Sequence, residues 1–385
     1  MFTSLTLVVL AGLLGPLLAA GKRFRVPVLV GELIGGIILG RTGLHLIDPA
    51  AQPFPVSASL GFAMLMLDSG TQIDLGSKVL RDSAVRAGLA FLTTLLVAIP
   101  AGLLIAAWTG SPHAALFSVL LAGSSAAIAL PTIRENGLAG PAVALVITWI
   151  ALADAVTVVL MPLTLTSAGK IPLALLGDAL IIVAAALVVM LGLRFLGGPQ
   201  ALAATQLSKQ RHWALRLRLS VLMLLSLGAI AEQTGASLLV AGFAAGIALR
   251  QFGEPHRLSL ELTGLATGFF VPVFFVLLGA TLDLRGLIAS PTAIALAIGM
   301  AVAATVVHLV ASIAVGRQPR LPSGLLASAQ LGLPAAAAAL GLFTGKLTPP
   351  IAAALVAGGL LTLIPATAGA ILLSRAAPAA SPELA

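Results

Sequence analysis

Long runs of apolar residues, separated by short polar turns, make up most of the chain. Strands that cross a bilayer would alternate apolar and polar residues, whereas these runs are continuous. Because each backbone polar group must be satisfied inside the membrane, continuous runs of this length predict transmembrane helices. We expect about thirteen of them, over residues 3–20, 27–44, 56–73, 84–108, 113–134, 139–164, 172–197, 214–232, 236–251, 258–281, 287–315, 321–344 and 348–373.

Composition supports the same fold class. The 385 residues are 59% hydrophobic and 9% charged, and the mean hydropathy is +1.12. A soluble domain carries about 25% charged residues, so this chain has too little polar surface for a soluble fold. We therefore predict an all-α polytopic membrane protein. The absence of cysteine excludes disulfides, thiolate catalysis and cysteine-ligated metals.

The basic residues indicate the topology. Of the 21 Lys and Arg residues, only Arg41, Lys170, Arg285 and Lys346 follow an even-numbered span. Cytoplasmic loops carry an excess of Lys and Arg, so the odd loops are expected inside the cell. This predicts an inner (plasma) membrane protein with its N-terminus outside and its C-terminus in the cytoplasm. The net charge of +8 lies in short loops, so we expect no nucleic-acid partner.

Residues 3–20 resemble the apolar region of a signal peptide, but their flanking charges have the wrong order. No Lys or Arg precedes the run, and Lys22, Arg23 and Arg25 follow it. A signal peptide has its basic residues before the apolar region. We interpret this stretch as the first span.

Three sequence matches indicate an internal repeat. Gly70–Leu75 recurs as Gly279–Leu284, 209 positions later, and Gly123–Ala127 corresponds to Gly332–Ala336 at the same offset. Val30, Gly36 and Ile37 correspond to Val240, Gly246 and Ile247 at an offset of 210. The repeats lie seven spans apart, an odd number, which gives them opposite orientations. Inverted repeats are typical of secondary transporters.

Spans 113–134 and 321–344 are the candidates for discontinuous helices. The first contains Gly123, Ser124, Ser125 and Pro131, and the second contains Gly332 and Pro334. Proline removes a backbone donor and glycine tolerates unwinding, so each span either breaks or merely kinks. Broken helices present free carbonyls and helix ends to an ion. Gln330 precedes the second expected break and is a candidate polar contact to it.

Asp154 lies near the centre of span 139–164, and Thr157 lies three residues further on the same helical face. An ionisable residue inside a span is either a hydrogen-bonded structural group or part of an ion path. In the functional interpretation Asp154 holds a proton and a cation (Na⁺ or K⁺) in alternation, because removal from water favours the neutral carboxyl form.

Three other polar residues within the spans allow more than one role. His308 is either a pH-dependent partner of Asp154 or a neutral histidine packed between helices. Glu32 lines a cytoplasmic funnel or lies at an interface. Asp68 lines the pathway or reaches the headgroups at the outer end of its span.

The segments Val26–Leu33, Gly35–Gly40 and Gly70–Leu75 resemble the monovalent cation/proton antiporter family. The closer branch contains bacterial sodium/proton antiporters and potassium-efflux proteins, and the similarity extends over essentially the whole chain. The resemblance implies a homodimer in which a core domain with two crossed discontinuous helices moves against a dimerisation domain, as an elevator. It also implies that Asp154 carries the ion and the proton, with Ser124 and Ser125 near the crossing.

The resemblance also implies a division of the chain. Dimerisation-side helices and the start of the first repeat would occupy residues 1–83, and the first half of the core 84–170. A linking helix and further dimerisation-side helices would occupy residues 171–285, the second half of the core 286–375, and a cytoplasmic tail 376–385.

Three positions depart from the family pattern. Ala153 stands where the family has Asp or Asn before the ion-carrying aspartate, and His308 stands in the span where electrogenic members have a lysine. Leu333 stands where an acidic residue is common in the second broken helix. With one carboxylate and no lysine, we expect electroneutral one-for-one exchange, with no choice between Na⁺ and K⁺.

Two other functions remain open at this point. A sodium-coupled organic-anion symporter has a similar inverted-repeat fold, and a non-transporting scaffold or sensor would need no complete ion site. We expect no enzyme, because neither a His-Glu-x-x-His nor a Gly-x-Gly-Asp pattern occurs. The expected partners are a monovalent cation, the proton, the lipid bilayer and a second copy of the chain. No cofactor is expected.

Overall fold

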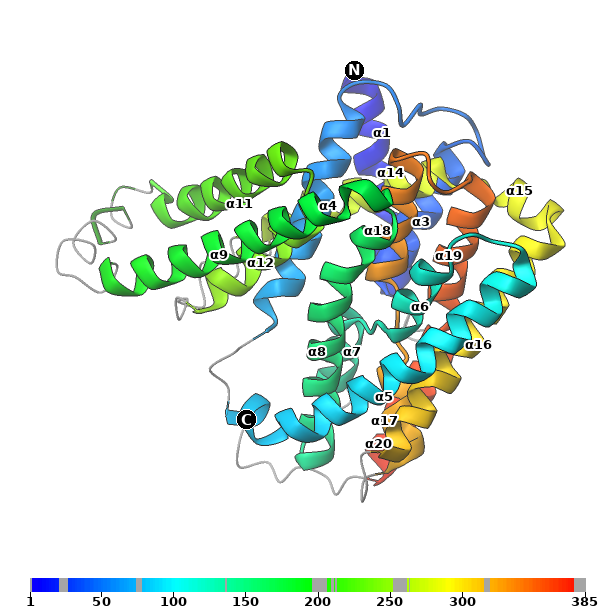
Figure 1. Ribbon diagram of the computed structural model, residues 1–385. Helices are drawn as coiled ribbons and strands as arrows, with labels where there is room; N and C mark the ends of the chain where they lie inside the picture. Colours follow the sequence, from blue (N-terminus) through cyan, green and yellow to red (C-terminus); the bar gives the residue numbers. More distant parts are fainter. Residues whose placement is uncertain are drawn as a thin grey trace. The chain divides into compact units, whose positions relative to one another are not determined.

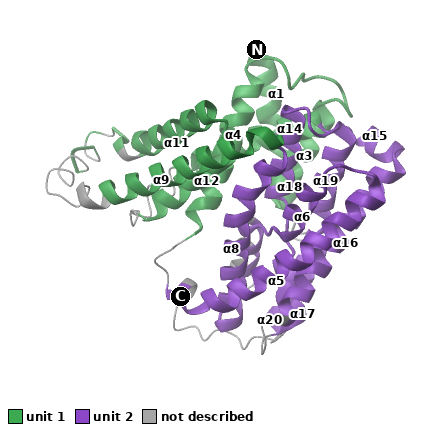
Figure 2. Cartoon of the chain, viewed as in Figure 1, with its two compact units in different colours: residues 1–75, 166–281 green, residues 76–165, 282–385 purple. Residues whose placement is uncertain are grey.

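The computed structural model describes residues 2–20, 27–73, 78–135, 137–195, 206–208, 211, 213–251, 262, 264–314 and 319–376. These residues form helices and connecting turns, without a strand among them, as Figure 1 shows. Two compact units divide the chain: unit 1 contains Met1–Leu75 and Thr166–Thr281, and unit 2 contains Gly76–Leu165 and Leu282–Ala385 (Figure 2).

Unit 1 is built from helices of both halves of the sequence. Its α-helices are α1 (Phe2–Gly12), α2 (Leu14–Ala19), α3 (Val28–Leu39), α4 (Phe54–Thr71), α9 (Ile171–Phe195), α11 (Leu215–Thr234), α12 (Leu238–Gln251) and α14 (Val271–Thr281). A short 3-10 turn, Ala168–Lys170, precedes α9, and a π-helical turn, Ala266–Phe270, leads into α14.

Glycines bring two helix pairs of unit 1 into backbone contact. A Cβ at Gly36 of α3 would overlap the Val276 carbonyl of α14, and one at Gly246 of α12 would overlap the Leu67 carbonyl of α4. The partner helices contribute Gly279 and Gly70, which lie equally close to the facing backbone. These glycines stand at the positions that the 209- and 210-residue offsets relate, which supports the repeat as an interpretation.

Unit 2 contains the remaining helices. They are α5 (Lys78–Thr109), α6 (Ala114–Ala122), α7 (Ala126–Glu135), α8 (Pro141–Thr164), α15 (Leu284–Ala289), α16 (Pro291–Ala314), α17 (Arg320–Ala327), α18 (Gly332–Phe343), α19 (Pro349–Leu361) and α20 (Leu363–Ala376). Asp283 caps α15, because its carboxylate accepts a hydrogen bond from the Gly286 N–H at 2.8 Å. Its counterpart in the repeat, Asp74, lies outside the described residues.

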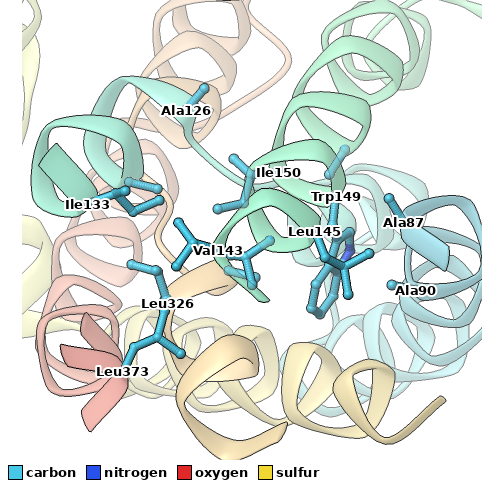
Figure 3. Close-up of a cluster of buried hydrophobic side chains, with 14 of the residues drawn as sticks. Ala87, Ala90, Ala126, Ile133, Val143, Leu145, Trp149, Ile150, Leu326 and Leu373 are labelled. Carbon is cyan, nitrogen blue, oxygen red and sulfur yellow. The ribbon is translucent and has the colours of Figure 1, made fainter. Parts of the chain in front are cut away.

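A buried apolar cluster fixes α8 inside unit 2. Val143, Leu145, Trp149 and Ile150 of α8 pack with side chains of α5, α7, α17 and α20 (Figure 3). Burial of this many apolar side chains holds the helix rigidly. Asp154 lies one turn beyond Trp149 on the same helix, so the cluster also fixes the position of its carboxylate.

The structure confirms the all-α fold class, whereas the number of spans stays a prediction. By length and composition, eight helical stretches of the described residues can cross a membrane. Val28–Leu39, Leu238–Gln251 and Ala266–Thr281 are apolar but shorter. The predicted boundary between spans 214–232 and 236–251 coincides with a helix end, because α11 ends at Thr234 and Gly235 adopts a φ of 72°.

The second helix break differs from its predicted place. The turn lies between α17 and α18, from Ser328 to Leu331, so Gln330 lies inside the break rather than before it. Pro334 stands in the first turn of α18, where a missing backbone N–H costs nothing. Pro131 likewise lies within α7 and does not interrupt it. Proline therefore marks helix restarts here less precisely than the prediction assumed.

Candidate functional site

Two interrupted helices meet inside unit 2. Between α6 and α7 the chain is extended at Gly123, with φ −72° and ψ 157°, and Ser124 and Ser125 follow before α7 begins. The Ser125 N–H donates to the Ala329 carbonyl of the other break at 2.8 Å. The Gln330 amide nitrogen donates to the Gly123 carbonyl at 2.7 Å. Each break thus satisfies backbone groups that its partner leaves free.

Asp154 of α8 faces the first break. Asp154 is 6% exposed, and its carboxylate lies near the backbone N–H of Ala126, the first residue of α7. The first N–H groups of a helix have no partner within it and carry partial positive charge, so they favour an anion. Of the residues described in unit 2, Asp154 is the one buried carboxylate.

Thr157 lies beside the same break, one turn along α8. A Cβ at Gly123 would be 3.4 Å from its hydroxyl oxygen and 2.7 Å from Leu333 Cδ2. The Thr157 hydroxyl donates to the Ala153 carbonyl at 2.6 Å, so its oxygen can still act as an acceptor or as a ligand to a cation. Ser125 of the first break lies near the start of α18, because its Oγ would be 3.8 Å from a Cβ at Gly332. Carboxylate, hydroxyl and carbonyl oxygens are the donors that a hard monovalent cation takes.

His308 of α16 joins this cluster from the opposite side. Its ring is 0% exposed, and its Nε2 lies 3.1 Å from the Ser124 Oγ. Its Nδ1 lies 2.8 Å from the Ala304 carbonyl, and its ring stacks on Trp149 with centroids 5.5 Å apart. The Trp149 indole in turn donates to the Thr94 hydroxyl at 3.2 Å.

A neutral His308 and Ser124 have too few N–H and O–H hydrogens for all three contacts with Ala304, Ala327 and each other. A carbonyl only accepts, so Nδ1 must donate to Ala304, and the Ser124 hydroxyl must donate to the Ala327 carbonyl at the end of α17. The Ser124 contact to Nε2 then needs a second ring N–H. A neutral His308 therefore satisfies two of these three bonds, and Ser124 must choose between Nε2 and Ala327. Protonation of His308 and the orientation of Ser124 are thereby linked.

The structure brings Asp154, Thr157, Ser124, Ser125, Gln330 and His308 together in unit 2, while their roles stay predictions. Glu32 and Asp68 belong to unit 1. Glu32 is 3% exposed in α3 beside Gly15, and Asp68 of α4 is half-buried next to Gln72. Their assignment to the pathway also stays a prediction.

Asp178 and Thr362 are among the buried polar residues that the sequence alone did not single out. Asp178, 3% exposed in α9 of unit 1, is an acidic residue within an apolar run, which is the signal that identified Asp154. Thr362, between α19 and α20, contacts the backbone of Gln330. Threonine is common in transmembrane helices, so no sequence signal distinguishes this one.

Comparison with known proteins agrees with this architecture. The profile of the family described as "Sodium/hydrogen exchanger, transmembrane" matches residues 8–377. The structure of the sodium proton antiporter MjNhaP1 from Methanocaldococcus jannaschii at pH 8 superposes with a TM-score of 0.64, at 17% identity, over 97% of this chain and 96% of that one. At this identity the likeness establishes the fold alone.

Relatives found by sequence are also described as Na⁺/H⁺ antiporters. The putative Na⁺/H⁺ antiporter YjbQ of Bacillus subtilis (strain 168) is 23% identical over 297 residues, 73% of this chain. That alignment spans 47%, about half, of the Bacillus protein's length. The Na⁺/H⁺ antiporter of Enterococcus hirae is 26% identical over 270 residues, 68% of each chain.

The long apolar helices, together with the family match, identify a multi-pass membrane protein. The chain belongs to the sodium/hydrogen exchanger transmembrane family, because the family profile covers nearly its whole length.

Proposed function

We propose that the protein is a secondary active antiporter that exchanges a monovalent cation, Na⁺ or K⁺, for H⁺ by alternating access. The observation that carries this proposal is the position of Asp154, a buried carboxylate held against the start of α7 where two helix breaks meet. The names of the relatives, which describe Na⁺/H⁺ antiporters, support it. The two ions are substrates, so the function needs no cofactor and no catalysed reaction.

Asp154 enforces exchange because its carboxylate cannot hold a proton and a metal ion at once. Burial makes the charged and empty form costly, so one of the two ions remains bound while the site changes sides. The Ser124, Ser125 and Thr157 oxygens and the carbonyls of the breaks would replace part of the hydration shell of the cation. Exposure of this site to each side in turn then couples the two fluxes.

Proteoliposomes with an internal pH dye test the proposal. When Na⁺ or K⁺ is added outside, cation entry should drive proton exit, and the interior should become more alkaline. A wild-type protein that moves no protons with either cation would refute antiport. Sodium-driven uptake of a labelled organic anion in the same vesicles would instead identify a symporter.

We expect the exchange to be electroneutral. One carboxylate holds either one proton or one monovalent cation, so both loaded forms of the site carry the same charge. With Na⁺ as the driving ion, the initial rate should not change when a K⁺ gradient and valinomycin set the membrane potential. A rate that follows the potential would mean that a second group, such as His308, carries charge through the cycle.

His308→Gln should change the pH profile of exchange more than its maximal rate. Glutamine can still donate to one neighbour and accept from another, but it cannot take up the extra proton that locks Ser124 on Ala327. Initial rates between about pH 6 and 9, which bracket the ordinary range of histidine, measure the effect. An unchanged profile would remove His308 from the mechanism.

The remaining parts of the proposal concern assembly and topology. Unit 2 holds the candidate site, which suits the core that moves, and unit 1 suits the dimerisation domain of a homodimeric elevator. The distribution of Lys and Arg supports a plasma-membrane protein with an external N-terminus and a cytoplasmic C-terminus. Cysteines introduced at Ser167 and at Ala376 should react with an impermeant thiol reagent from opposite sides of the membrane.

A further inference from the structure

The second break is held by a residue that belongs to neither interrupted helix. Thr362 joins α19 to α20 and is 1% exposed. Its hydroxyl oxygen accepts the Gln330 N–H at 2.9 Å and lies 3.1 Å from the Gln330 carbonyl and 2.6 Å from the Gly359 carbonyl. The Gln330 N–H has no helical partner, because it lies between α17 and α18, so a buried acceptor must satisfy it.

The backbone at this joint also touches the break directly. A Cβ at Gly359 would lie 3.0 Å from the Gln330 carbonyl oxygen and 3.1 Å from Pro334 Cγ. A glycine one turn before Thr362 therefore allows α19 to approach the break closely enough for the hydroxyl contact. The close approach and the hydrogen bonds are independent observations of the same attachment.

Gln330 connects Thr362 to the first break. Its backbone is fixed by Thr362, and its side-chain amide donates to the Gly123 carbonyl at 2.7 Å. Thr362, Gln330 and Gly123 thus form one connected path from the α19–α20 joint to the break that Asp154 faces. Because the site needs its oxygens at fixed positions, this path pre-organises the site before a cation arrives.

The first half of unit 2 has a similar arrangement. There α8, the helix that follows the interrupted one, contacts the break through Asp154 at the Ala126 N–H. Position 362 is the repeat counterpart of Ala153, the neighbour of Asp154, at the offset of 209. In both halves, a polar side chain of the helix that follows the break contacts backbone of that break. This side chain is the Asp154 carboxylate in the first half and the Thr362 hydroxyl in the second.

We propose that Thr362 is a positioning residue for cation binding, which acts through Gln330 on the Gly123 carbonyl. This inference rests on the proposed antiport for its kinetic consequence only. Loss of the hydroxyl leaves the Gln330 N–H unsatisfied and loosens both breaks, so the cation must order its own ligands on binding. The apparent Km for the cation then rises, whereas the steps that set the maximal rate change little.

Thr362→Val and Thr362→Ser make a matched pair, because valine keeps the shape without the hydroxyl and serine keeps the hydroxyl. Thr362→Val should raise the apparent Km for Na⁺ or K⁺ about tenfold, which equals about 1.4 kcal/mol of site stabilisation. Thr362→Ser should remain close to wild type. If Thr362→Val is not recovered folded, Gly359→Ala displaces the same backbone with the hydroxyl intact and should raise the Km as well.

A double variant tests the path. Gln330→Leu alone should raise the Km, and addition of Thr362→Val should raise it little further, since both changes break one connection. Effects that multiply, or a normal Km in Thr362→Val beside a raised Km in Gln330→Leu, would overturn the inference.

Hydrogen–deuterium exchange separates this inference from the proposed function. In Thr362→Val, but not in Thr362→Ser, the amides of residues 123–126 and 328–331 should exchange faster in detergent, whether or not the protein transports. An unchanged exchange pattern would overturn the positioning role even if antiport is established. Faster exchange in a protein without antiport would retain the link and refute the function.

Discussion

Asp154→Asn should reduce cation-driven proton flux to the background of empty liposomes, a loss of at least about a hundredfold. Asparagine keeps the shape of the side chain and an acceptor oxygen near the Ala126 N–H, so the fold should survive. The substitution removes the group that releases a proton and attracts the cation. An interaction with a charged group contributes up to about 3 kcal/mol, and each 1.4 kcal/mol corresponds to a factor of ten.

Asp178→Asn is the matched control for this substitution. Asp178 is likewise a buried aspartate of a long apolar helix, but it belongs to α9 of unit 1. The control should retain exchange, and both variants should elute as wild type in size-exclusion chromatography. Flux at the wild-type rate in Asp154→Asn would refute the assignment of the site.

Gly36→Ala should destabilise the protein by about 3 kcal/mol or more, which is the upper range for an atom forced into a packed contact. The added Cβ would overlap the carbonyl oxygen of Val276, and backbone in the middle of α14 cannot move aside as a flexible side chain does. We expect a much lower yield of folded protein and a melting temperature well below wild type, followed by fluorescence-detected size exclusion after heating.

Gly88→Ala provides the comparison for Gly36→Ala. Gly88 lies within α5, and a Cβ there would meet no atom within 4 Å. Alanine in a helix interior is favoured over glycine by about 0.5–1 kcal/mol, so this variant should melt at or slightly above the wild-type temperature. Equal melting of Gly36→Ala and Gly88→Ala would contradict the close packing of α3 on α14.

Apolar pattern predicted most helices, because a segment that buries itself in lipid must be apolar along its length. The same reasoning found Asp154, since one acidic residue in such a run is conspicuous. The Gly123-Ser124-Ser125 break was also predictable, because three residues with low helix preference occur together. Ser328–Leu331 contains neither glycine nor proline, so its position depends on contacts with Gly123, Ser125 and Thr362 that no local pattern records.

The contacts of His308 show the same limit. The sequence shows that His308 lies in an apolar span. It does not separate a pH-dependent partner of Asp154 from a neutral histidine packed between helices. The structure places its ring between Ser124 and Ala304 and stacks it on Trp149. Trp149 itself looked like an ordinary apolar residue, because stacking across helices 159 positions apart leaves no trace in either segment.

Competition between a proton and a cation for Asp154 is the centre of this account, and equilibrium binding measures it most directly. Isothermal titration of Na⁺ or K⁺ into purified protein, in buffers of different ionisation enthalpy, gives the Kd and the number of protons released. We predict one proton released per cation bound on the acidic side of the titration, a Kd that rises about tenfold for each unit of pH lowered there, and neither effect in Asp154→Asn. A wild-type Kd that does not depend on pH, with no proton released, would contradict the account.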